Sequence, residues 1–175
     1  MTSVRGMAIA ELGRIAEIDR SEEIEQQYRS RSGVLHLVDV SIHAPRWGEP
    51  GEAPVERYVA SWRRQLERGG VLLGAFDGDR LLGVALYDRS SVDEPARLAE
   101  LYVTREHRGE GIGRALIEEI GRLARADGAK RLYVSATPTR ATVDFYLKRG
   151  FEPLANPNER LLALEPEDIH MAMAL

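Results

Sequence analysis

The sequence contains no cysteine, which excludes disulfide bridges, thiolate metal sites and cysteine nucleophiles. It also lacks any window that approaches the roughly 18 consecutive apolar residues of a membrane span. Residues 1–11 do not contain the apolar run of a secretory signal peptide. These three absences predict a soluble cytoplasmic protein that does not bind a membrane.

Lysine is scarce, because Lys130 and Lys148 are the only two and arginine supplies the rest of the 24 basic residues. The 28 acidic residues bring the net charge to −4, so the basic surplus typical of nucleic-acid binders is missing and no nucleic-acid partner is expected. Hydrophobic residues make up 43% of the 175 positions, which is enough to bury one core. We therefore expect one domain over residues 1–175.

Strand and helix patterns alternate along the chain without an internal repeat. Extended segments are predicted over 3–10, 34–42, 71–76, 81–87, 97–104, 130–136, 151–154, 161–164 and 169–175. Helices are predicted over 12–18, 22–29, 55–68, 112–126 and 140–149. The turn Asp77-Gly78-Asp79 joins two of the strands into a hairpin, while Ser21 and the acidic run up to Glu25 favour a helix start. This order predicts an α/β protein with a mixed sheet flanked by helices.

The segment with the clearest chemical meaning is Arg108-Gly109-Glu110-Gly111-Ile112-Gly113, which connects a predicted strand to the strongest predicted helix. Glycines allow a ligand to approach the backbone, and the first N–H groups of a helix attract an anion such as a phosphate. The dinucleotide-binding fingerprint fails because its third glycine is replaced by Arg114, and no Gly-Lys-Ser/Thr follows as in a P-loop. A tight strand-to-helix turn without a ligand is the alternative for this motif taken alone.

Two motifs together resemble the GNAT N-acetyltransferase superfamily. Arg108-x-x-Gly111-x-Gly113, preceded by Leu101-Tyr102-Val103, resembles its acetyl-CoA pyrophosphate loop, and residues 144–151 (DFYLKRGF) resemble its second signature. The resemblance implies a GNAT-like acyl-CoA N-acyltransferase fold, with a central mixed, mostly antiparallel sheet. It further implies that two central strands, near 97–104 and 130–136, splay apart. Residues 70–175 would form the acetyl-CoA-binding core and residues 1–69 the acceptor side.

The same resemblance assigns contacts to acetyl-CoA, the implied acyl donor. Pantetheine would pair with the backbone of Leu101, Tyr102 and Val103, and the N–H of Val103 would polarise the thioester carbonyl. The pyrophosphate would bind to Arg108, Gly109, Glu110, Gly111, Ile112, Gly113, Arg114 and Ala115. An asparagine usual in the second signature is missing, and the hydroxyl of Thr139 is the expected substitute.

Direct transfer to an amine needs a base for the amine and an acid for the leaving thiolate. Glu100 is the candidate base and Tyr146 the candidate acid. The alternatives are that Glu100 is a solvated outward residue of its strand and that Tyr146 is an aromatic at the edge of the core. No metal is expected, because the spacing of His36, His43, His107 and His170 is not that of a metal site.

The expected acceptor is a primary amine on a small molecule or a peptide. Trp47, in a loop rich in proline and glycine, is the candidate acceptor contact, whereas Trp62 shares a helical stripe with core residues. The acidic run 21–25 could also attract a cationic acceptor. A non-catalytic acyl-CoA-binding sensor is the alternative function, and a homodimer through the terminal strand 169–175 is left open.

Overall fold

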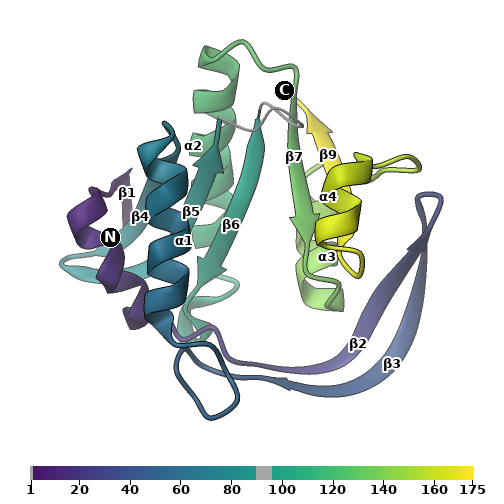
Figure 1. Ribbon diagram of the computed structural model, residues 1–175, viewed down its shortest axis with the longest axis horizontal. Helices are drawn as coiled ribbons and strands as arrows, with labels where there is room; N and C mark the ends of the chain where they lie inside the picture. Colours follow the sequence, from purple (N-terminus) through teal and green to yellow (C-terminus); the bar gives the residue numbers. More distant parts are fainter. Residues whose placement is uncertain (1, 90–95) are drawn as a thin grey trace.

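The computed structural model describes residues 2–89 and 96–175. In this part of the chain seven strands form the main sheet, in the order β1-β4-β5-β6-β7-β9-β8, and two more form a separate ribbon, β2-β3 (Figure 1). The strands are β1 (Thr2–Gly6), β2 (Glu22–Arg31), β3 (Val34–Ala44), β4 (Val71–Asp77), β5 (Arg80–Asp88), β6 (Arg97–Val103), β7 (Arg131–Ala136), β8 (Glu152–Pro153) and β9 (Ile169–Ala174). The α-helices are α1 (Val55–Glu67), α2 (Ile112–Ala126), α3 (Arg140–Leu147) and α4 (Glu159–Leu164), and η1 (Ile9–Glu17) and η2 (Arg105–His107) are 3₁₀ helices.

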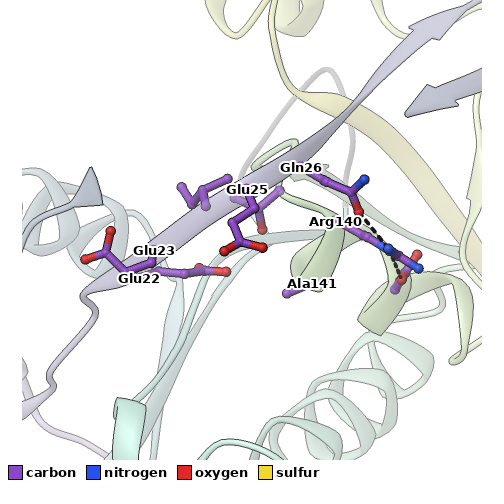
Figure 2. A pocket seen from close by; sticks show the side chains of 9 residues that line it. Glu22, Glu23, Glu25, Gln26, Arg140 and Ala141 are labelled. Atoms are coloured by element: carbon purple, nitrogen blue, oxygen red, sulfur yellow. Dashed lines mark hydrogen bonds and ion pairs between the residues drawn. The ribbon is translucent and has the colours of Figure 1, made fainter. Parts of the chain in front are cut away.

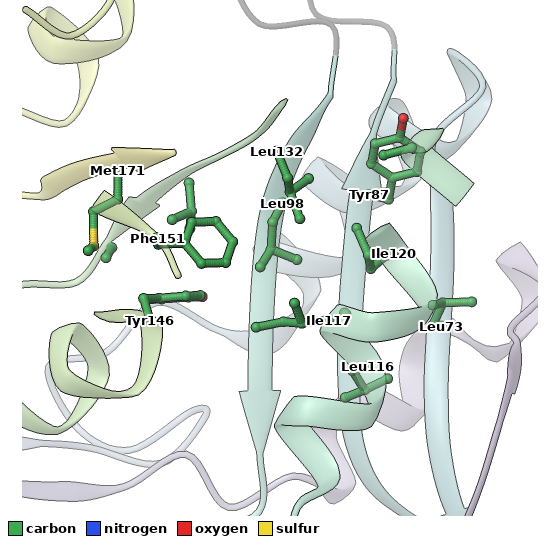
Figure 3. Close-up of a cluster of buried hydrophobic side chains, with 14 of the residues drawn as sticks. Leu73, Tyr87, Leu98, Leu116, Ile117, Ile120, Leu132, Tyr146, Phe151 and Met171 are labelled. Atoms are coloured by element: carbon green, nitrogen blue, oxygen red, sulfur yellow. The ribbon is translucent and has the colours of Figure 1, made fainter. Parts of the chain in front are cut away.

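Helices cover both faces of the main sheet. On the face that we call the α2 face, α2 and α3 bury Leu116, Ile120 and Val143 against strand residues such as Leu98 (Figure 3). On the opposite face, the α1 face, α1 and η1 pack a second apolar cluster against the sheet. The stripe of α2 and the hairpin of β4 and β5 are therefore as the sequence predicts. In the described residues, no helix is both long and apolar enough to cross a membrane.

The two parallel strands in the middle of the sheet pair only at their first residues. Arg97 and Leu98 of β6 pair with Tyr133 and Val134 of β7, and no later residue of β6 pairs with β7 in the described chain. The strands then diverge toward their carboxyl ends (Figure 1). The expected splay is confirmed, and it leaves one edge of β6 without a neighbouring strand.

Residues 22–29 form a strand and not the predicted helix. Strand β2 pairs with β3 in a ribbon that crosses below the diverging ends of β6 and β7 (Figure 1). Its middle is tied to the start of α3, because the N–H of Tyr28 donates to the carbonyl of Pro138 at 2.8 Å and the Tyr28 hydroxyl donates to Asp144 at 2.8 Å. Neither side of the ribbon faces a full core, so its polar residues do not alternate with apolar ones, and pairing with β3 outweighs their helical preference. Ser21 accordingly caps no helix and donates to Asp19 instead.

Two further predictions are corrected. Residues 161–164 belong to helix α4 and are not extended, because the side chain of Asn158 accepts hydrogen bonds from the N–H groups of Arg160 and Leu161 and starts a helix there. The predicted strand 3–10 ends at Gly6, and the helical pattern after it is a 3₁₀ helix, η1. Both corrections concern short segments, whose type depends on caps and contacts more than on periodicity.

Candidate functional site

The loop after β6 leaves a row of backbone N–H groups free. Gly109 and Gly111 have φ angles of 86° and 87°, a left-handed conformation that favours glycine. The first backbone hydrogen bond of α2 runs from the N–H of Ala115 to the carbonyl of Gly111, at 3.0 Å. The N–H groups of Ile112, Gly113 and Arg114 consequently have no partner within the helix. Together with the positive end of the helix dipole, they can bind an anion.

Helix α3 approaches this loop closely at Gly113. A Cβ atom at this position would lie 3.0 Å from the ring of Phe145, which is tighter than ordinary van der Waals contact. The third glycine of the motif therefore has a packing role, since it lets α3 lie against the first turn of α2. The two motifs that the sequence analysis linked by resemblance alone are in contact.

The unpaired edge of β6 presents its own backbone groups. The N–H of Thr104 donates to Leu82 at 2.8 Å, and Val103 stands opposite Gly83, so the N–H and carbonyl of Val103 point away from β5. Its carbonyl accepts a hydrogen bond from Nε of Arg108 at 3.2 Å. The edge next to β7 can add an extended chain by backbone hydrogen bonds.

A β-bulge at Ala99 sets the direction of the Glu100 side chain. Leu86 stands opposite Glu100 and Tyr87 opposite Leu98, so Ala99 is the extra residue. Leu98 packs on the α2 face, whereas Ala99 and Tyr102 pack on the α1 face. Glu100, two residues before Tyr102, therefore also lies toward α1, and strand alternation alone would have placed it with Leu98. No sequence signal identified this bulge.

Burial gives Glu100 an unusual acidity. Its partly buried carboxyl has a pKa raised to about 7, mainly by burial. The polar groups of Tyr102 and Trp62 and the charge of Arg97 lower the pKa, but not enough to offset that effect. A carboxylate of this kind can accept a proton near neutral pH. Glu100 is thus not the fully solvated residue of the alternative interpretation.

Tyr146 lies on α3, on the other side of the diverging strands. Its ring packs edge-on against Phe145 and Phe151, with centroid distances of 5.2 and 5.1 Å, and the residue is 4% exposed. Its hydroxyl end points toward β6 (Figure 3). Burial raises the pKa of the phenol well above its ordinary value, and the charge of Glu100 raises it further. The two predicted catalytic residues are therefore close enough to influence each other.

The loop that contains Trp47 packs on the same face as Glu100. The ring of Trp47 lies 4.7 Å from that of Tyr58 and 5.2 Å from that of Tyr102. The guanidinium of Arg20 covers Trp47 at 4.3 Å and pairs with Glu52 at 2.5 Å, which fixes the loop. Trp62 is 1% exposed, as expected for a core residue.

A pocket of about 340 Å³ lies between the ribbon and the start of α3 (Figure 2). Its lining includes Glu22, Glu23 and Glu25 of β2, facing Arg140 of α3. Arg140 donates to the side chain of Gln26 at 2.6 Å. The described residues include no group of three or more His, Asp or Glu side chains placed to hold a metal ion.

Thr139 lies at the first position before α3, where its hydroxyl is already occupied. Its Oγ1 accepts from the N–H of Thr142 at 3.2 Å and donates to the Thr142 hydroxyl at 2.9 Å, and the residue is 2% exposed. This is the geometry of a helix N-cap. The hydroxyl that the sequence analysis assigned to a cofactor serves the helix in this structure.

Replacing Thr139 with valine should destabilise the protein by about 1 kcal/mol, because the buried N–H of Thr142 loses its acceptor. For a chain of this length the expected fall in Tm is about 3 °C, measured by thermal unfolding. Thr139→Ser retains the hydroxyl and should unfold within about 1 °C of the wild type. Equal Tm values for the valine and serine variants would contradict the capping role.

Comparison with known proteins gives a consistent result. Residues 39–161 match the family model described as "Acetyltransferase (GNAT) domain". A curated relative, "Uncharacterized N-acetyltransferase YobR" of Bacillus subtilis (strain 168), is 32% identical over 78 residues, or 44% of this chain. The chain matches only about a third of that protein's length (32%).

Solved structures resemble the whole chain. A nourseothricin acetyltransferase superposes with a TM-score of 0.70 at 20% identity and covers 99% of this chain and 98% of its own. A putative streptothricin acetyltransferase from Bacillus anthracis str. Ames, in complex with acetyl coenzyme A, has a TM-score of 0.70 at 16% identity, covering 100% and 99%. The PaiA N-acetyltransferase from Thermoplasma acidophilum, in complex with coenzyme A, has a TM-score of 0.62 at 19% identity, covering 100% and 99%. At these identities the likeness concerns the fold, and it confirms the predicted architecture.

Proposed function

Because the chain belongs to the acetyltransferase (GNAT) domain family, we propose that it transfers an acetyl group from acetyl-CoA to a primary amine in a ternary complex. The observation that carries the proposal is the divergence of β6 and β7 beside the free N–H groups of α2. Two solved structures with the same fold contain coenzyme A or acetyl coenzyme A, which supports this donor. The acceptor is a small-molecule or peptide amine.

The donor fits the groups that the structure leaves free. The pyrophosphate has the N–H groups of Ile112, Gly113 and Arg114 available, with Arg108 next to them. The pantetheine amides have the outward backbone of Leu101 and Val103, on the edge that β7 leaves open. The N–H of Val103 then points to where the thioester carbonyl develops negative charge.

The acceptor approaches from the α1 face, where the bulge directs Glu100. An alkyl amine is largely protonated at neutral pH and cannot attack until it loses a proton. With its pKa near 7, Glu100 is a suitable base, either directly or through one water molecule. Trp47 and Tyr102 form the neighbouring wall, and they are the residues that we assign to acceptor contact.

The leaving thiolate faces Tyr146. A thiol has an ordinary pKa of about 8.5, and burial raises the pKa of this phenol above 10. Full proton transfer from Tyr146 to the thiolate is therefore unfavourable, so we assign Tyr146 the role of a hydrogen-bond donor to the developing charge on sulfur. This refines the acid role expected from the sequence.

The protons balance as follows. The ammonium gives one proton to Glu100, the free amine attacks the thioester carbon, a C–N bond forms and the C–S bond breaks. The second proton leaves the nitrogen and reaches sulfur, by way of the Tyr146 hydroxyl or water. The products are the acetamide and the free thiol, and Glu100 releases its proton to solvent. No covalent intermediate with the protein is required.

Calorimetry and thiol release test the proposal together. We expect acetyl-CoA at 100 times its Kd to stabilise the fold by about 2.7 kcal/mol, a rise in Tm of about 8 °C. ATP and NAD should leave Tm unchanged. A panel of amines with acetyl-CoA should then release free thiol, and binding without release from any amine would favour the non-catalytic sensor. Absence of acetyl-CoA binding would overturn the proposal.

A further inference from the structure

Arg149 is held rigidly beside the glycine loop. Its guanidinium stacks on the ring of Phe145 at 3.6 Å, and its Nη1 donates to the carbonyl of the same residue at 2.7 Å. The ring of Phe145 in turn meets Gly113 in the first turn of α2. Contacts of this kind fix the cation next to α2, although Arg149 comes from the end of α3.

The charges around Arg149 are unbalanced. In the described parts of the chain no carboxylate forms an ion pair with it, and its buried Nε has no hydrogen-bond partner. The nearest charge is another cation, Arg114, which lowers the pKa of Arg149 together with burial. Arg114 has one carboxylate at hand, Glu118 at 3.0 Å, on the exposed side of α2. Two guanidiniums close together with a buried unused donor are the surroundings of a missing anion.

We propose that Arg149 and Arg114 bind the 3′-phosphate on the ribose of coenzyme A. The inference rests on the proposed function, because it takes coenzyme A as the ligand. The pyrophosphate already has the free N–H groups of the loop, so the remaining phosphate is the monoester. Arg114 extends along α2 toward Glu118 and away from the loop, and this places the arginine pair beside the pyrophosphate site.

The chemistry of guanidinium suits this ligand. Arginine presents a planar set of donors that can contact two oxygens of a phosphate at once. The stack on Phe145 holds the plane of Arg149 in place before the ligand arrives, so less rotamer entropy is lost on binding. A dianionic phosphate would also relieve the repulsion between the two arginines.

Titration calorimetry with coenzyme A and with 3′-dephospho-CoA tests the assignment. The wild type should bind coenzyme A about tenfold more tightly than the dephosphorylated form. Arg149→Met should weaken binding of coenzyme A about tenfold and leave that of dephospho-CoA unchanged. Arg122→Met is the matched control, because it removes one exposed arginine of α2 that pairs with Glu119, and it should retain the wild-type preference.

Three results would overturn the assignment. Equal affinity of the wild type for both ligands would exclude recognition of the 3′-phosphate. An equal loss for both ligands in Arg149→Met would place the arginine at the pyrophosphate. If the wild type binds neither ligand, the proposed function itself fails. Arg149→Lys covers the case in which the methionine variant unfolds, because it keeps the charge and should retain part of the preference.

Discussion

Replacing Tyr146 with phenylalanine should lower kcat by about 10²-fold, because the leaving thiolate loses its hydrogen-bond donor. The Kd of acetyl-CoA should stay within about twofold of the wild type, since the ring keeps its packing against Phe145 and Phe151. Steady-state thiol release and calorimetry with acetyl-CoA measure the two quantities.

Tyr87→Phe is the matched control for this prediction. The Tyr87 hydroxyl donates to Asp127 at 3.0 Å, so its removal should cost about 1 kcal/mol of stability and leave kcat unchanged. An unchanged kcat in Tyr146→Phe would show that the phenol is only a core aromatic. A change in Kd without a change in kcat would lead to the same conclusion.

Replacing Glu100 with glutamine should lower kcat/KM by about 10²-fold at pH 8, because the amine loses its base. In the wild type the active form carries the ionised carboxylate. With a pKa of about 7, kcat/KM should rise about tenfold per pH unit below neutrality and level off above it. The variant should lose this acid limb. A pH profile of kcat/KM between pH 5.5 and 9 measures both effects.

The same carboxyl should affect stability in the opposite direction. The folded state raises the pKa of Glu100, so it binds the proton more tightly than the unfolded chain does, and stability falls as the pH rises through the interval from about 4.5 to about 7. Glu100→Gln should remove this contribution, and denaturant unfolding at pH 5 and pH 8 detects it. Glu119→Gln, an exposed carboxylate of α2, should change neither the pH profile nor this dependence. An acid limb that persists in Glu100→Gln would assign the base to another group or to water.

Local patterns account for the parts of the fold that the sequence predicts correctly. The turn Asp77-Gly78-Asp79 and the apolar runs on each side specify a hairpin, and the stripe of Ile112, Leu116 and Ile120 specifies a buried helix face. These features depend on residues that are neighbours in the sequence or one helical turn apart. For the same reason Gly111 could be placed at the start of the helix before the structure was known.

The sequence could not predict the features that depend on distant partners. Residues 22–29 have the composition of a helix and form a strand, because β3 pairs with them and the start of α3 anchors them. Tyr146 and Glu100 could be named, but only the contact between α3 and the glycine loop and the path of β6 bring them to the same region. The roles of these residues remain predictions that the experiments above test.

By itself, the sequence determined the order of most elements, the glycine loop and the identity of the titratable groups, since each follows from short-range spacing. The tertiary structure alone decided that Ala99 bulges and turns Glu100 toward α1, that β6 and β7 separate after Leu98, and that Arg149 lies beside Arg114. The physical reason is that burial and charge act through space. The pKa of a carboxyl and the balance of two arginines depend on which side chains folding brings together, and residues far apart in the chain carry no local mark of that proximity.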